Sequence, residues 1–322
     1  MKIYLRNSIV VWLLAGICLS SVVNAQQPIF KVIPLGVKGG LDERNLSAYL
    51  LAVNGTSNYI ALDAGTIYAG IQTAIHKKIW NSTIMQSVLQ DSIKGYCISH
   101  GHLDHVAGLI LNSPNDTKKN IYAMPYCLQV LKQNYFTWQS WANFADAGTP
   151  PLLNKYHYVT LQAGKEIPLA ATEMAITPFV LSHGVQYNST AFLIRYKDAY
   201  LLYLGDTGAD SIEHSHDLAT LWNYIAPLIK KHALKGIFIE VSYPNEQPES
   251  QLFGHLTPHL LLQELNKLAL LTGKSAIKKL PIVITHIKPS DDNEHIIQTQ
   301  LFNNNSLQLQ FIFAQQAVPL FF

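Results

Sequence analysis

The sequence predicts an α/β protein in which two β-sheets pack together and helices cover their outer sides. Short apolar runs rich in β-branched and aromatic residues recur in both halves of the 322-residue chain, and helix-like segments follow them in each half. Such alternation is typical of helices packed on sheets. No linker separates the halves, and 48% hydrophobic against 14% charged residues is typical of a globular chain. We therefore expect residues 26–322 to form one domain.

The first half opens with three strand-like runs and then alternates between helix and strand. Its predicted strands are IFKVIPLG (29–36), SAYLLAV (47–53), YIALDAG (59–65), KGYCIS (94–99) and NIYAMP (120–125). Helices are predicted from Ile71 to Leu89 and over HVAGLILN (105–112). Residues 135–159 are aromatic and then broken by Pro and Gly, which indicates a helix followed by an irregular excursion.

The second half repeats this order of strands and helices. Its predicted strands are the apolar runs at 174–184, 189–196, 199–208, 236–242 and 280–290. One helix is predicted from Ser211 to His232, and an amphipathic helix over residues 257–271 has Pro258 in its first turn. Each half thus supplies a sheet and the helices to cover it.

Residues 1–25 have the pattern of a cleaved signal peptide. Lys2 and Arg6 precede an apolar run from Ile9 to Leu19, and Val23-Asn24-Ala25 is a small-residue cleavage site. The alternative is a retained membrane anchor, but the run is shorter than the roughly 20 residues that a spanning helix needs. We expect an exported protein, periplasmic or secreted, with no membrane span after cleavage.

The composition of the chain after cleavage limits which partners and which disulfide bonds are expected. Losing residues 1–25 removes two of the 23 Lys and Arg side chains, so 21 remain against 21 acidic ones. A neutral chain does not favour a nucleic-acid polymer as partner. Cys97 and Cys127 are too few for a disulfide framework. Cys97 lies in an apolar strand run, which favours a buried thiol; a Cys97–Cys127 disulfide is the alternative.

The stretch CISHGHLDHVAGL carries the strongest functional signal. Where a strand runs into a helix, it places four metal-binding side chains within six positions: His100, His102, Asp104 and His105. The first two are two residues apart, so both imidazoles could point to one side of the strand end. One tetrahedral zinc needs four ligands in all, so two neighbouring ions account better for the crowding. The alternative is a set of surface or capping side chains, with Asp104 capping the next helix.

Three more candidate ligands lie where apolar strands end. His183 follows VLS and precedes a glycine, Asp206 lies in YLGDTG, and His286 ends PIVITH. Each alone is more typical of a cap or a hydrogen-bonded turn, but three of them beside the cluster favour a metal site. Imidazole and oxygen ligands without cysteine suit zinc, and manganese or iron would also fit.

The cluster resembles a family signature. HGHLDHVAGL is similar to the H-x-H-x-D-H motif of the metallo-β-lactamase superfamily, and the longer HGHLDHVAGLILNSP (100–114) resembles the signature of class II cyclic-nucleotide phosphodiesterases. FIEVSYPN (238–245) and LFGHLTP (252–258) also look like that family. The resemblance covers the mature chain and implies a metallo-β-lactamase-like four-layer αββα sandwich, with the site between the sheets at one edge.

The same resemblance implies a role for each candidate ligand. Two divalent metal ions, expected to be Zn²⁺, would be held by His100, His102 and His183 on one side, by Asp104, His105 and His286 on the other, and by Asp206 bridging the two. Asp63, in ALDAG, would orient a ligand imidazole. A turn-forming Asp before Gly65 is the alternative for that residue.

The implied reaction is hydrolysis of 3′,5′-cyclic nucleotides to nucleoside 5′-monophosphates, with cAMP as the expected substrate and cGMP as a second candidate. Two metal ions can lower the pKa of a shared water, whose hydroxide attacks phosphorus in line with the leaving 3′ oxygen. Asp104 and His255 are the expected catalytic residues, with His255 as proton donor to that oxygen or as a phosphate contact. The alternative is that Thr257 caps the next helix and His255 lies on the surface.

Other functions are compatible with the same ligands. Another exported hydrolase of this superfamily, or a tRNA-processing nuclease, would use nearly the same set. The export signal argues against tRNA, and Leu103 with Ser113-Pro114 favours the cyclic nucleotide. Outside the enzymes, the alternative is a metal-dependent nucleotide-binding protein without turnover.

Overall fold

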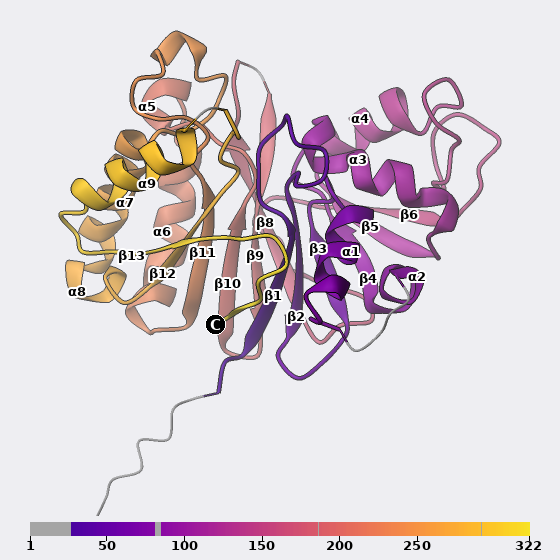
Figure 1. Ribbon diagram of the computed structural model, residues 1–322, viewed down its shortest axis with the longest axis horizontal. Coiled ribbons are helices and arrows are strands. Elements are labelled where there is room, and N and C mark those ends of the chain that lie inside the picture. Colours follow the sequence, from indigo (N-terminus) through magenta and orange to yellow (C-terminus); the bar gives the residue numbers. More distant parts are fainter. Residues whose placement is uncertain (1–26, 81–84, 186, 291) are drawn as a thin grey trace, which may run out of the picture.

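The computed structural model describes residues 27–80, 85–185, 187–290 and 292–322. The predicted signal peptide and its cleavage site lie outside this part of the chain. Two sheets form the middle of the molecule and helices cover both outer faces (Figure 1). The predicted αββα sandwich is therefore confirmed.

The described residues form two seven-stranded sheets, and the first has the spatial order β14-β1-β2-β3-β4-β5-β6. Its strands are β1 (Phe30–Gly36), β2 (Ala48–Val53), β3 (Tyr59–Leu62), β4 (Ile93–Cys97), β5 (Lys119–Ala123), β6 (Tyr156–Thr160) and β14 (Leu320–Phe321). Strand β14 pairs antiparallel with β1, so the last strand of the chain joins the sheet that the first strand began.

The second sheet has the order β13-β12-β11-β10-β9-β8-β7. Its strands are β7 (Ile167–Pro168), β8 (Ala175–Ser182), β9 (Asn188–Tyr196), β10 (Ala199–Leu204), β11 (Leu234–Glu240), β12 (Pro281–Thr285) and β13 (Gln310–Phe313). Strands β10 to β13 run parallel here, as β3 to β6 do in the first sheet. Loops that follow parallel strands gather at one edge of a sheet, where ligand sites commonly form.

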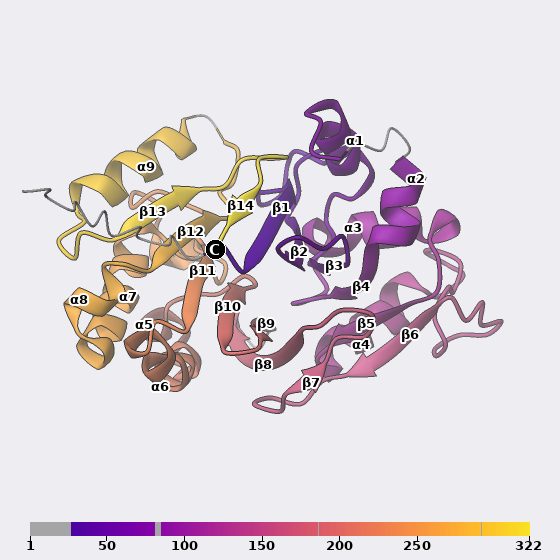
Figure 2. The ribbon, with the colours of Figure 1, turned by 90° about the horizontal axis from the view of Figure 1, so that it is seen from below.

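Helices lie on the outer face of each sheet (Figures 1 and 2). The first sheet is covered by α1 (Tyr68–His76), α2 (Met85–Ser87), α3 (Leu103–Asn112) and α4 (Pro125–Val130), and the second by α5 (Asp210–Glu213), α6 (Asp217–Lys230), α7 (Pro258–Thr272), α8 (Lys274–Ile277) and α9 (Asn293–Asn303). Four further helical turns are η1 (Val88–Ser92), η2 (Ser113–Asn115), η3 (Leu131–Tyr135) and η4 (Glu249–Gln251). None of the helices in the described part of the chain is long and apolar enough to cross a membrane.

Both faces of the sheets are buried, which explains why the strands read as continuous apolar runs. In β2, Leu50 and Ala52 belong to the core beneath the outer helices, whereas Tyr49 and Leu51 belong to the core between the two sheets. A third core lies between the second sheet and its helices and includes the buried Trp222. Successive residues of a strand point alternately into these two cores. If a strand paired with its neighbour one residue out of register, every side chain would move from one core to the other.

Two predicted helices are wrong in extent. The helix predicted from Ile71 to Leu89 is interrupted, because α1 ends before Lys78, which has a left-handed φ of 59°. The helix predicted from Ser211 to His232 is divided by His214, which has a φ of 53°. A residue in the left-handed conformation ends the run of helical hydrogen bonds. The apolar periodicity from which the helices were predicted carries no information about that backbone conformation. The sequence analysis also missed β6, β7, β13, β14, α4, α8 and α9. The helix expected within residues 135–159 is wrong, because the chain is irregular between η3, which ends at Tyr135, and β6.

Both predicted thiols are buried and unpaired. Cys97 and Cys127 are free cysteines with almost no exposed surface. The buried-thiol prediction is confirmed, and the alternative disulfide is wrong.

Candidate metal centre

The seven predicted ligands come from loops at one edge of the two sheets. Four follow β4, at the start of α3, and the others follow β8, β10 and β12. The structure brings all of them together: His100, His102, Asp104, His105, His183, Asp206 and His286. Residues from both halves of the chain therefore build a single site between the sheets, as expected.

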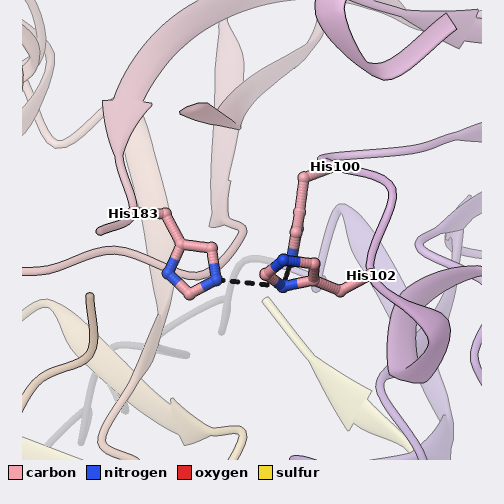
Figure 3. A group of neighbouring side chains, drawn as sticks. All are labelled: His100, His102 and His183. Atoms are coloured by element: carbon pink, nitrogen blue, oxygen red, sulfur yellow. Dashed lines mark hydrogen bonds between the residues drawn. The ribbon is translucent and has the colours of Figure 1, made fainter. Parts of the chain in front are cut away.

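Three of the histidines form the first group of donor atoms. His102 Nδ1 lies 3.1 Å from His100 Nε2 and 3.2 Å from His183 Nε2 (Figure 3). His183 Nδ1 donates a hydrogen bond to the Gly254 carbonyl at 2.8 Å, which leaves the Nε2 lone pair directed at the group. His102 also stacks in parallel on Tyr187, with ring centroids 4.6 Å apart. These contacts orient the rings so that three nitrogens face one point.

Asp104, His105 and His286 form the second group. His286 Nε2 lies 3.1 Å from His105 Nε2 and 3.2 Å from Asp104 Oδ2. Asp104 is in the first turn of α3, but its carboxylate accepts a hydrogen bond from the Gly40 amide at 3.0 Å and makes no cap. The alternative in which Asp104 caps this helix is therefore wrong.

Asp206 lies between the two groups. Its Oδ1 is 3.2 Å from His105 Nε2, and its Oδ2 is 3.1 Å from His286 Nε2. The same Oδ2 is 3.7 Å from the Nε2 atoms of both His100 and His183. One buried carboxylate thus faces donor atoms of both groups.

Asp63 is fully buried and contacts the ligand His105 on the side of the ring that faces away from the donor group. Its Oδ2 lies 2.7 Å from His105 Nδ1 and also accepts a hydrogen bond from the Tyr203 hydroxyl at 2.7 Å. The Ser99 amide and hydroxyl donate to the same carboxylate at 2.7 and 2.8 Å. A proton on Nδ1 of His105 leaves Nε2 free as a ligand atom, so the geometry supports the orienting role. Asp63 also has a left-handed φ of 55°, so the turn that was its alternative is present as well.

The backbone at the site is strained where it places ligands. His286 has a φ of 57°, an uncommon value for a residue with a side chain. Gly39 packs against it so closely that an added Cβ would lie 2.3 Å from the imidazole. Strained residues persist when the surrounding structure determines them and are common at functional sites.

Electrostatics keep the first group neutral. Burial, reinforced by neighbouring imidazoles, lowers the pKa of His100 well below its usual range. Burial also lowers the pKa of His102 to about 4 and lowers that of His183. Neutral imidazole is the form that binds metal ions.

The second group lies in a negative field. Burial opposes a charge on His105, but three carboxylates, led by Asp206, outweigh it and raise the pKa of this imidazole. Burial likewise opposes the ionisation of Asp206, yet His105 and His286 outweigh it and hold the pKa of the carboxyl well below its usual range. Converging lone pairs beside ionised carboxylates are the donor set that a divalent cation needs. The residues present therefore fit divalent metal ions.

His255 is buried beside this centre rather than exposed on the surface. Its Nδ1 lies 2.8 Å from Glu240 Oε1 and 3.9 Å from Asp206 Oδ2, and its ring stacks on His286. Burial lowers the pKa of His255 to about 4. Thr257 does cap α7, because its hydroxyl accepts a hydrogen bond from the Leu260 amide, but the surface placement of His255 in that alternative is wrong.

Sequence reasoning missed Glu240 and Ser242. Glu240 ends β11, is buried, and accepts hydrogen bonds from the Thr207 amide at 2.8 Å and the Ser242 hydroxyl at 2.5 Å. Burial, and then the nearby Asp206, raise the pKa of Glu240 to about 7. Ser242 Oγ also lies 3.0 Å from His286 Nδ1. A single acidic residue ending the apolar run GIFIE was an available signal, the same one that identified Asp206.

Comparisons with known proteins agree with this geometry. A model of the family described as class-II cAMP phosphodiesterases matches residues 29–316. The 3′,5′-cyclic-nucleotide phosphodiesterase of Aliivibrio fischeri is 43% identical over 314 residues, which are 93% of this chain and 94% of that protein.

Two solved structures share the fold. Unliganded yeast PDE1 has a TM-score of 0.82 at 24% identity, over 92% of this chain and 100% of that one. The metallo-β-lactamase fold protein YhfI from Bacillus subtilis has a TM-score of 0.59 at 14% identity, over 90% of this chain and 98% of that one. The predicted metallo-β-lactamase-like fold is confirmed.

Proposed function

We infer the function from the family: the chain belongs to the class II cAMP phosphodiesterases, and it is an enzyme that hydrolyses 3′,5′-cyclic nucleotides. The observation that carries this function is the extent of the family match, which includes every residue of the metal centre from Asp63 to His286. Hydrolysis breaks the bond between phosphorus and the 3′ oxygen and yields a nucleoside 5′-monophosphate. Divalent metal ions fit both the fold and the donor atoms.

Two Zn²⁺ ions are the proposed occupants of the centre. The proposed ligands are His100, His102 and His183 for one ion, Asp104, His105 and His286 for the other, and Asp206 for both. When bound, such ions supply positive charge opposite the phosphate oxygens and a water of lowered pKa as the nucleophile. The absence of thiolate among the donors supports zinc bound by nitrogen and oxygen rather than a cysteine-rich site.

The chain itself supplies orientation for that chemistry. Four ligand imidazoles have their second ring nitrogen next to a fixed polar atom, and the pairs are His100 with Ser99, His105 with Asp63, His183 with Gly254, and His286 with Ser242. Fixing the rear nitrogen sets the tautomer and the direction of each ring, so the front nitrogens need little rearrangement to bind a cation. Preorganisation of this kind lowers the free energy that the reaction would otherwise spend on reordering the site.

Asp104, which is partly exposed, and His255, which is buried beside the centre, are the proposed catalytic residues. The Asp104 carboxylate is held by the Gly40 amide and faces His286, which keeps it at the metal position. His255 is held at Nδ1 by Glu240, so its Nε2 is directed away from the buried glutamate. We assign to His255 Nε2 a contact with the phosphate or the proton that the leaving 3′ oxygen needs. The second role requires the neutral tautomer with its proton on Nε2, and the raised pKa of Glu240 allows that carboxyl to hold the proton of the Nδ1 hydrogen bond.

Export is also part of the proposal. The sequence pattern of residues 1–25 supports cleavage after Ala25 and a periplasmic or secreted enzyme. Mass spectrometry of the mature protein should find Gln26 as its first residue. An intact Met1 on a membrane-bound protein would contradict it.

One assay panel tests the function. The purified protein should hydrolyse cyclic AMP or cyclic GMP to the 5′-monophosphate, lose this activity on chelation and regain it with added zinc. A β-lactam and bis-p-nitrophenyl phosphate serve as competing substrates for the other hydrolases of this fold. Turnover of the β-lactam without turnover of a cyclic nucleotide would overturn the function, and nucleotide binding without turnover would favour the non-catalytic alternative.

A further inference from the structure

Lys288 is a half-buried cation beside the metal centre, two residues after His286. Among the partly or fully buried lysines, Lys38 and Lys119 pair with carboxylates, whereas Lys94, Lys155 and Lys235 donate to backbone carbonyls. No carboxylate in the described ranges pairs with Lys288. A partly desolvated charge without a counter-ion costs free energy. What distinguishes Lys288 from the other lysines is therefore its place next to the metal centre.

Two contacts place the Lys288 ammonium at the centre. Its Nζ lies 5.8 Å from the centroid of the Tyr243 ring, and that ring is 5.8 Å from the His255 ring. On the other side, a Cβ added to Gly40 would lie 3.9 Å from Nζ, and the Gly40 amide donates to Asp104. The ammonium therefore lies beside two residues, Tyr243 and Gly40, that each touch a proposed catalytic residue.

The backbone fixes this position. The Lys288 amide donates to the Ser242 carbonyl at 3.2 Å, and Ser242 in turn contacts His286 through its hydroxyl. Gly40 has a φ of 62° and no side chain, so it leaves room where the ammonium lies. The lysine is therefore anchored at its backbone, and its head group lies next to the residue whose amide holds Asp104.

This is also the side on which the centre is accessible. His102 and Leu103 are exposed, and Asp104 and Gly40 are partly exposed, whereas His100, His105 and His286 are buried. A substrate must approach from the exposed rim, where Lys288 adds a positive charge that the metal ligands do not supply. A compact ammonium is suited to binding a phosphate oxygen as a point charge.

We propose that the ammonium of Lys288 binds a non-bridging phosphate oxygen of the cyclic nucleotide and of its 5′-monophosphate product. This inference rests on the proposed function, because it assigns a phosphate to the rim of that site. Lys288 contributes to phosphate affinity and does not bind the nucleoside.

The test separates the phosphate from the nucleoside. Lys288→Met removes the charge at similar length, Lys288→Arg keeps it, and Lys197→Met is the matched control on the exposed turn between β9 and β10. Affinities of zinc-loaded proteins for 5′-AMP and for adenosine are measured by titration calorimetry, with competition for weak ligands.

Lys288→Met should weaken 5′-AMP binding by about tenfold, a typical loss for a charge-assisted hydrogen bond at a partly exposed site. Adenosine binding should stay within about twofold, and Lys288→Arg within about threefold of the original affinity for 5′-AMP. Hydrolysis of cyclic AMP by Lys288→Met should lose a similar factor in kcat/KM and depend less on ionic strength.

Unchanged 5′-AMP binding by Lys288→Met would overturn the proposal, and so would an equal loss of adenosine binding, which indicates a structural role. Zinc content and circular dichroism verify that each variant is folded and loaded, and Lys288→Gln replaces Lys288→Met if the latter does not fold. The proposed function is tested independently of Lys288. It would be contradicted only if the unsubstituted enzyme did not hydrolyse a cyclic nucleotide.

Discussion

Replacing Asp206 by Asn perturbs the one carboxylate that faces both donor groups. The substitution keeps the shape of the side chain but exchanges one oxygen for an amide nitrogen and removes the charge. No neighbour could take its place, because Gly205 and Thr207 flank it and the next acid along the chain is Asp210. The histidines keep their second contacts, so metal binding need not be abolished.

The size of the loss follows from the position of the carboxylate. The Asp206 oxygens lie 3.1 to 3.7 Å from four ligand nitrogens, so a cation held by those nitrogens is close to the charge. Two unit charges about 4 Å apart interact by about 4 kcal/mol at an effective dielectric constant of about 20. A loss of about 2.7 kcal/mol in the transition state already lowers the rate about a hundredfold. We therefore expect at least about a hundredfold loss in kcat for cyclic-nucleotide hydrolysis.

The assay needs a control for general stability. Asp210→Asn is the same substitution at another buried carboxylate, one that accepts hydrogen bonds from the Leu218 and Ala219 amides. It should lower stability by about 1 kcal/mol through weaker capping and leave kcat unchanged. Activity, zinc content and thermal unfolding are measured on the same preparations.

Two results would refute the reasoning. Near-normal hydrolysis by Asp206→Asn with full zinc content would mean that YLGDTG is only a turn and that the bridging ligand is assigned wrongly. An equal loss of activity in Asp210→Asn would mean that the effect of Asp206 is one of stability.

Three further predictions follow from the same site. Elemental analysis should find about two metal ions per chain after reconstitution; a value that stays near one argues against a binuclear centre. His255→Ala should lower turnover while both ions stay bound, and Glu240→Gln should lower it less, because it weakens only the positioning of the imidazole; unchanged turnover in His255→Ala removes this residue from the mechanism. Burial raises the pKa of the Cys97 and Cys127 thiols, so both should stay neutral at pH 8 and react with a thiol reagent only after unfolding; rapid reaction of either in the folded protein that begins at Gln26 would show that the thiol is accessible.

The sequence alone identified most strands and all seven proposed ligands. The strands are visible because both faces of each sheet are buried, which makes runs such as GIFI (236–239) continuously apolar. Three of the ligands, His183, Asp206 and His286, are visible because each is a polar residue that follows an apolar run at the end of a strand. The spacing within residues 100–105 is a local property of the chain, and local properties are what a sequence displays directly.

The tertiary structure alone decided how these residues meet. Asp206 faces both donor groups only because the two sheets present the ends of their strands at the same edge, which brings residues more than 180 positions apart, such as His105 and His286, to 3.1 Å. The supporting residues Ser99, Ser242 and Lys288 have no distinctive spacing, and they gain their roles from neighbours distant in sequence. The breaks at Lys78 and His214 depend on a single backbone angle each, which packing selects and apolar periodicity does not encode. Local side-chain patterns thus fix which elements and ligand types occur, whereas pairing between sheets fixes the distances on which the chemistry depends.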